Sequence, residues 1–86
     1  MKNVMTELGK MLAKQAEKDL ALARKHGKLA VTGTRVGNIE IRYRKFATLG
    51  GQYMIVNFNN TNFAHAVGRK AEMIKFLVDN YEVIHE

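Results

Sequence analysis

The sequence contains neither cysteine nor proline, and both absences narrow what the protein can be. Without cysteine there is no disulfide framework and no thiolate zinc site. Without proline, every turn must come from glycine and asparagine. No run approaches the roughly 20 apolar residues that a membrane helix needs, and residues 1–13 lack the continuous apolar core of a signal peptide. We therefore expect a cytoplasmic protein that does not engage membranes.

What is present is the composition of one small globular domain. The chain has 86 residues, of which 47% are hydrophobic and 26% charged, and this fits a single domain over residues 1–86. The net charge of +6 is unevenly placed, because residues 24–46 hold seven lysines and arginines against Glu40 alone. Such an asymmetry favours an anionic partner.

The first third of the chain has the apolar spacing of an amphipathic helix. Apolar residues recur three and four positions apart, which predicts a helix over residues 4–26. Asn3 suits its N-cap and Gly27 its C-cap. The predicted apolar stripe is Met5, Leu8, Leu12, Ala16, Leu20 and Ala23, widened by Val4 and Met11.

Alternating patterns then predict strands over residues 29–35, 39–47 and 53–58, with turns at 36–38 and 49–52. In the second strand, Ile39, Ile41 and Tyr43 point to one face and the charged residues between them to the other. Lys45 falls on the apolar face, which predicts a bulge or a strand end near Arg44. The third strand is apolar on both faces and is expected to be central and buried.

Residues 59–68 allow two interpretations. They either begin a helix over residues 62–80, or form a hairpin loop into a fourth strand over residues 63–67. We favour the strand, because Gly68 would be costly inside a helix. In both cases residues 69–80 are helical and residues 83–84 are candidates for an edge strand. The core-facing residues of this helix are expected to be Ala71, Ile74, Leu77, Val78 and Tyr81.

The predicted architecture is therefore an α+β two-layer domain. It has an N-terminal helix, a three- to four-stranded antiparallel sheet and a C-terminal helix, with both helices on one face of the sheet.

The charged face of the second strand is the main candidate for binding. Arginine presents forked donors that match phosphate oxygens, and tyrosine rings can stack on bases. This pattern predicts contact with a nucleic-acid backbone, although an ordinary solvated sheet face would have the same pattern. The residues concerned are Arg42 and Arg44, extended by Arg35 and Lys45, with Tyr43 or Tyr53 available for stacking.

Two further basic groups extend this prediction. Lys10, Lys14 and Lys18 lie in line on the first helix, where they form either a contact with phosphates or a plain solvent face. Arg69 and Lys70 open the last helix, whose N-terminus suits an anion. The alternative for this second group is ordinary helix capping.

No arrangement of residues points to catalysis, a metal or a cofactor. The sequence has no His-x-x-x-His pair, no paired carboxylates at useful spacing and no Walker-type loop. Gly68-Arg69-Lys70 resembles the basic helix start of double-stranded-RNA-binding domains, but the residues that follow do not, and no family is assigned on it. We expect a non-enzymatic protein without cofactor or metal.

Two functions are consistent with these observations. The first is a small basic protein that binds a nucleic-acid backbone. The alternative is a protein-binding regulator, an inhibitor or adaptor of the kind that phage or accessory genes encode, which docks on an acidic protein surface. Pairing of residues 63–67 or 83–84 across a two-fold axis would give a homodimer compatible with either function.

Overall fold

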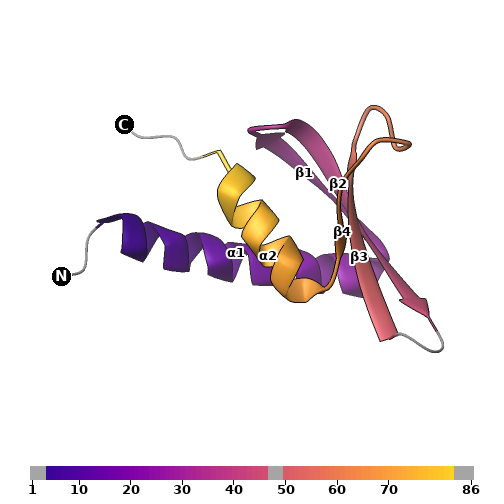
Figure 1. Ribbon diagram of the computed structural model, residues 1–86, viewed down its shortest axis with the longest axis horizontal. Helices are drawn as coiled ribbons and strands as arrows, with labels where there is room; N and C mark the ends of the chain where they lie inside the picture. Colours follow the sequence, from indigo (N-terminus) through magenta and orange to yellow (C-terminus); the bar gives the residue numbers. More distant parts are fainter. Residues whose placement is uncertain (1–3, 47–49, 83–86) are drawn as a thin grey trace.

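The computed structural model describes residues 4–46 and 50–82, and it shows an α+β fold of two layers (Figure 1). The strands form one antiparallel sheet in the order β1-β2-β3-β4, and both helices cover the same face. Residues 64–68 form a strand, so the favoured fourth strand is confirmed and a helix over residues 62–80 is wrong. The elements are α1 (Val4–His26), β1 (Lys28–Thr34), β2 (Gly37–Phe46), β3 (Gly50–Asn57), β4 (Ala64–Gly68) and α2 (Lys70–Asn80).

The core lies between the sheet and the two helices. Ile41 and Ile55 sit opposite each other on β2 and β3, and both are fully buried, as is Leu20 of α1. Burying each such side chain stabilises the fold by roughly 1.5–3 kcal/mol. The buried core cluster is Ala16, Leu20, Ala23, Ile39, Ile41, Tyr53, Ile55, Met73 and Leu77.

Two predictions about helix faces are wrong. Met11 is 67% exposed, so it does not widen the apolar stripe of α1. In α2, Ala71 is exposed and Met73 is buried instead. Met73 and Leu77 are four residues apart and share one helix face, whereas Ala71 lies two residues from Met73 and so points away from it.

The first hairpin turns one residue earlier than expected. Arg35 and Val36 form the turn, and Gly37 already belongs to β2 with a φ of +88°, a conformation that favours glycine. The Thr34 hydroxyl donates to the Gly37 carbonyl at 2.5 Å. The Arg35 N–H donates to the Asn80 carbonyl at 2.8 Å, which attaches this turn to the end of α2.

The second hairpin is regular where an irregularity was predicted. β2 and β3 pair without a break from Ile39↔Asn57 to Phe46↔Gly50, so there is no bulge or strand end at Arg44. Lys45 is exposed although it lies on the same face as Tyr43, because this part of β2 runs past the helices. Gly50 belongs to β3 and not to a turn. Residues 47–49 lie outside the described residues, and so do two predicted features, the Asn3 cap and the candidate strand at residues 83–84.

The register of the sheet shifts in β1, between Val31 and Thr34, and again at β4, where there is a bulge. Ile55 pairs with Ala66 and Val56 with Ala64, so His65 is the additional residue. Its ring lies 4.8 Å from that of Phe63 and 6.1 Å from that of Phe76, and its Nε2 is buried without a hydrogen-bond partner among the described residues. β4 is an edge strand, where pairing with a second copy stays a prediction.

Candidate functional site

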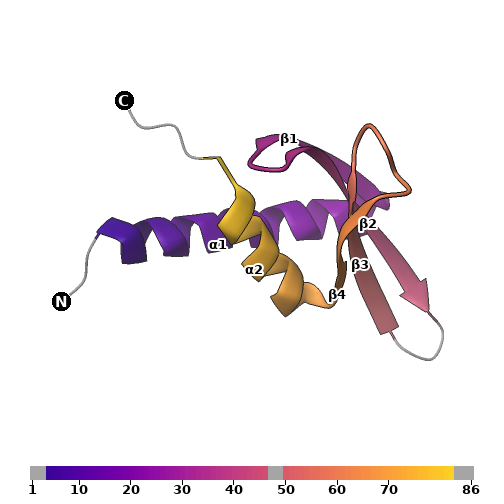
Figure 2. The same ribbon diagram turned by 45° about the horizontal axis from the view of Figure 1, so that its top comes forward.

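The end of β2 and the start of β3 project from the sheet as a two-stranded ribbon (Figure 2). On one side, the last described backbone hydrogen bond from β2 to the segment beside it runs from the Tyr43 N–H to the Gly27 carbonyl, at 3.0 Å. On the other side the pairing of β4 ends at Tyr53↔Gly68. Residues 44–46 and 50–52 continue beyond these points and pair only with each other; we call them the β2–β3 ribbon. Arg44 and Lys45 are both exposed on it, on opposite faces.

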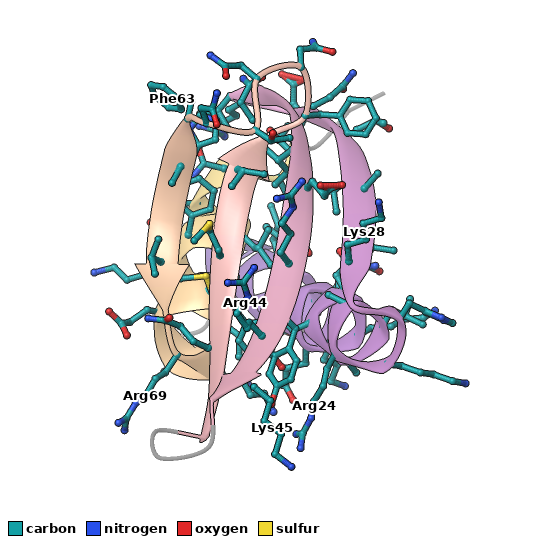
Figure 3. All side chains as sticks on the ribbon, turned by 90° about the vertical axis from the view of Figure 1, so that its right-hand side faces the viewer. Arg24, Lys28, Arg44, Lys45, Phe63 and Arg69 are labelled. Carbon is teal, nitrogen blue, oxygen red and sulfur yellow. The ribbon has the colours of Figure 1, made fainter. Side chains whose placement is uncertain are left out.

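The strand order brings two chain junctions beside this ribbon. In an antiparallel meander, the start of β1, the end of β2, the start of β3 and the end of β4 share one end of the sheet. The α1–β1 and β4–α2 junctions therefore both lie there. Figure 3 shows Arg24, Lys45 and Arg69 extending from this end, with Arg44 and Lys28 further up the sheet. We call these five residues and Lys70 the basic end, and all six are exposed.

Two ion pairs are formed within residues 4–46 and 50–82. Arg42 Nε lies 2.8 Å from Glu40 Oε1, and Lys70 Nζ lies 3.9 Å from Glu17 Oε1. Glu40 is only 8% exposed, so Arg42 compensates a buried carboxylate and is less available to a ligand than Arg44. Both members of the Lys70–Glu17 pair are more than half exposed, and such a pair contributes little.

The basic sheet face predicted from the sequence is only partly assembled. Arg42 and Arg44 share the outer face, the face turned away from the helices. Tyr43 lies on the opposite face and packs against the core. Arg35 lies at the other end of the sheet, in the turn before Gly37. Arg42 is five positions after Gly37 along β2, roughly 17 Å at the usual rise of a strand.

Of the other two predicted basic groups, one lies away from the basic end and the other joins it. Lys10, Lys14 and Lys18 are exposed along α1, which lies against the helix-covered face and not the outer face. Arg69 and Lys70 join the basic end through their side chains. The backbone at the start of α2 is not free, because the Arg69 N–H donates to Glu72 Oε1 at 3.1 Å.

Two hollows of about 400 Å³ each open beside the β2–β3 ribbon. The outer pocket lies between the α1–β1 junction and the outer face, and its lining includes Lys28, Arg42, Arg44 and Met54. The second hollow, which we call the tyrosine pocket, was not predicted. It is lined by Arg24, Tyr43, Gly51, Tyr53, Arg69 and Lys70.

The β3–β4 half of the sheet carries no charge at all. Residues 46–68 contain no Lys, Arg, Asp or Glu, a signal that could have been read from the sequence. Met54 and Val67 face each other across β3 and β4 and are 38% and 45% exposed, while Phe58 and Phe63 are about half exposed nearby. The molecule therefore presents an uncharged apolar half beside its basic end.

No group of three or more His, Asp or Glu residues capable of holding a metal ion occurs in the part of the chain that the structure describes. Among the same residues, no helix combines the length and the apolar character that crossing a membrane requires. Comparisons with protein-family models, with curated proteins and with solved structures return no match.

Proposed function

We propose that this is a non-enzymatic binding protein that contacts a nucleic-acid backbone through its basic end. The observation that supports the proposal is that six exposed cations from separate parts of the chain lie at one end of the sheet or just above it. Of these six, Lys70 alone has a carboxylate within 4.0 Å among the described residues. Cations held together without counterions favour a polyanion.

The shape of the basic end suits a duplex as well as a single strand. A two-stranded ribbon fits the major groove of B-DNA, which is about 12 Å wide. Arg44 and Lys45 lie on opposite faces of the β2–β3 ribbon, so they reach toward opposite groove walls. Contacts of this kind fix position and supply affinity without reading the base sequence.

Binding should therefore be strongly salt-dependent. A protein that neutralises about five phosphates of duplex DNA releases their counterions, and the logarithm of its affinity falls against the logarithm of salt concentration with a slope of about −4.5. Fluorescence anisotropy with labelled duplex DNA and single-stranded RNA measures this slope. Absence of binding to both polymers at about 50 mM salt would overturn the proposal.

Two variants with the same change in net charge distinguish binding at the basic end from an effect of the overall positive charge. Arg44→Glu with Lys45→Glu changes the β2–β3 ribbon, and Lys10→Glu with Lys14→Glu changes the exposed side of α1. Each pair replaces two positive charges with two negative ones and lowers the net charge from +6 to +2. We expect the ribbon variant to lose most of its affinity and show a shallower salt slope, and the α1 variant to stay close to wild type. Equal losses would contradict a localised site.

The apolar half supports a second candidate, a protein-binding regulator. Phosphate contacts make no use of Met54 and Val67, whereas exposed apolar residues next to a charged rim are typical of protein interfaces. The partner would be a protein whose acidic surface meets the basic end. In a pull-down from nuclease-treated lysate, this alternative requires a stoichiometric protein that is retained by wild type and by the α1 variant. That protein must be lost with Val67→Glu and with the ribbon variant.

A further inference from the structure

The tyrosine pocket is built around a pair of rings on the helix-covered side of the sheet. Tyr43 and Tyr53 are directly paired on β2 and β3, with ring centroids 4.9 Å apart and planes inclined by 58°. Arg24, from the last turn of α1, places its Cζ 5.5 Å from the centroid of the Tyr43 ring. Tyr43 therefore already has Tyr53 and a guanidinium against it, and a base could stack on Tyr43 only by displacing one of them.

What the two tyrosines still offer is their hydroxyl groups. Neither hydroxyl makes a hydrogen bond within the described part of the chain. Burial raises the pKa of Tyr53, an effect that the nearby Arg24 partly offsets, so this hydroxyl stays protonated at neutral pH. A protonated tyrosine can donate a hydrogen bond to an anion.

Gly51 makes room for this arrangement. It lies on β3 opposite Lys45, two pairs beyond Tyr43↔Tyr53 and on the same face as Tyr53. A Cβ atom at Gly51 would overlap the Tyr43 hydroxyl and the adjacent ring carbons. The Tyr43 hydroxyl thus reaches over the β2–β3 ribbon because no side chain is present there.

Three cations complete the lining. Arg24 comes from α1, and Arg69 and Lys70 come from the β4–α2 junction. Arg24 and Arg69 make no ion pair with any described carboxylate, and Lys70 has only the long, exposed contact to Glu17. The Glu72 carboxylate accepts the Arg69 N–H and makes no ion pair with these three cations among the described residues.

We propose that the tyrosine pocket binds a terminal phosphate group, held by Arg24, Arg69 and Lys70 with the two tyrosine hydroxyls as additional donors. A phosphomonoester carries about −1.5 to −2 charges at neutral pH and presents three strong acceptor oxygens, whereas a backbone diester carries one charge. A concave site with three cations matches the monoester better, and a continuous strand would have to enter and leave the hollow. The inference rests on the proposed function where the phosphate belongs to a strand end, but a free nucleotide offers the same chemistry.

The test compares three labelled single-stranded oligonucleotides of one sequence, with a phosphate at the 5′ end, at the 3′ end or at neither. We expect one phosphorylated form to bind roughly tenfold more tightly than the unphosphorylated strand, as one or two added charge-assisted hydrogen bonds allow. Arg69→Gln should abolish that preference, so that the phosphorylated and unphosphorylated strands bind this variant equally, whereas the control Lys14→Gln should keep the preference. Equal binding of all three strands would overturn the inference, and so would a preference that survives Arg69→Gln.

If no strand binds, the proposed function is contradicted but the phosphate pocket is not, and the pocket is then tested with small ligands. AMP and inorganic phosphate are titrated into isotope-labelled protein, and backbone amide shifts are followed by NMR. Saturable shifts at Gly51, Tyr53 and Arg69 that are lost in Arg69→Gln support the pocket, and their absence overturns it. Where the phosphorylated strand does bind, AMP should compete with it. Failure of AMP to compete, or unchanged binding of the phosphorylated strand in Arg69→Gln, overturns the inference.

Discussion

The hydroxyl of Tyr81 donates a hydrogen bond of 2.6 Å to Asp19, which joins the residue after α2 to the middle of α1. The second Asp19 oxygen accepts a hydrogen bond of 2.9 Å from the Gln15 amide. Asp19 is only 8% exposed. A buried carboxylate is costly unless it is hydrogen-bonded, so this contact constrains how the two helices pack.

Replacing Tyr81 by Phe should destabilise the protein by about 1–3 kcal/mol, because it leaves a largely buried carboxylate oxygen without its donor. Urea unfolding followed by circular dichroism measures the loss. Tyr43→Phe is the control, since the Tyr43 hydroxyl has no hydrogen-bond partner among the described residues. Equal destabilisation by the two variants would contradict the role assigned to Tyr81.

The same contact predicts a pH dependence. Burial, followed by the hydrogen bond and the charge of Asp19, raises the pKa of Tyr81 far above its ordinary value of 10.0. Because the folded state holds this proton more tightly, its contribution to stability is complete below pH 10 and is lost as the pH rises above it. The stability difference between wild type and Tyr81→Phe should shrink above pH 10, by at most about 1.4 kcal/mol per pH unit. A difference that stays constant up to pH 11.5 would argue against the raised pKa; taking the difference cancels the other tyrosines and the lysines.

Two glycine-to-alanine changes should have opposite effects. Gly51→Ala places a methyl group where the Tyr43 hydroxyl lies, and we expect a loss of about 1–3 kcal/mol from overpacking. Gly9→Ala adds a methyl group to α1 that meets no atom within 4 Å beyond its own stretch of helix, and should gain up to about 1 kcal/mol from helix propensity. Thermal unfolding of both variants tests this. An unchanged unfolding temperature for Gly51→Ala would mean that the Tyr43 side chain can adopt another rotamer that avoids the added methyl group.

Replacing the two arginines of the outer face one at a time should change the stability of the protein by different amounts. Arg42→Gln removes the partner of Glu40, whose side chain is 10% exposed, and should cost about 1–2 kcal/mol. Arg44→Gln removes an exposed cation that has no described ion pair and should stay within about 0.5 kcal/mol of wild type. If chemical denaturation gives the same midpoint for both variants, the Arg42–Glu40 pair contributes nothing measurable.

The sequence was sufficient to predict the elements and their layering. Residues such as Leu20 and Ile41 lie in local patterns, of period three to four and of period two, that depend on no distant contact. The face of Tyr43 was also predictable, since alternation places it with Ile41 and away from Arg42. These features needed no knowledge of the strand order.

The basic end could not be predicted, because it depends on long-range geometry. Arg24, Lys45 and Arg69 come from three separate segments, and only the order β1-β2-β3-β4 brings them to one end of the sheet. The regular pairing at Arg44 was missed for a related reason. The alternation of Lys45 and Phe46 does not reveal that β2 extends beyond the helices.

The order of the elements also bears on how the chain folds as it is synthesised. Each strand pairs with the strand before it, so the sheet grows through short-range hairpins that close quickly. α2 is the last of the described elements, and it must return to α1 from far along the chain. Until α2 packs, Leu20 and Ile55 are only partly buried. A nascent chain that ends before Leu77 would therefore expose aggregation-prone apolar surface and depend on chaperones.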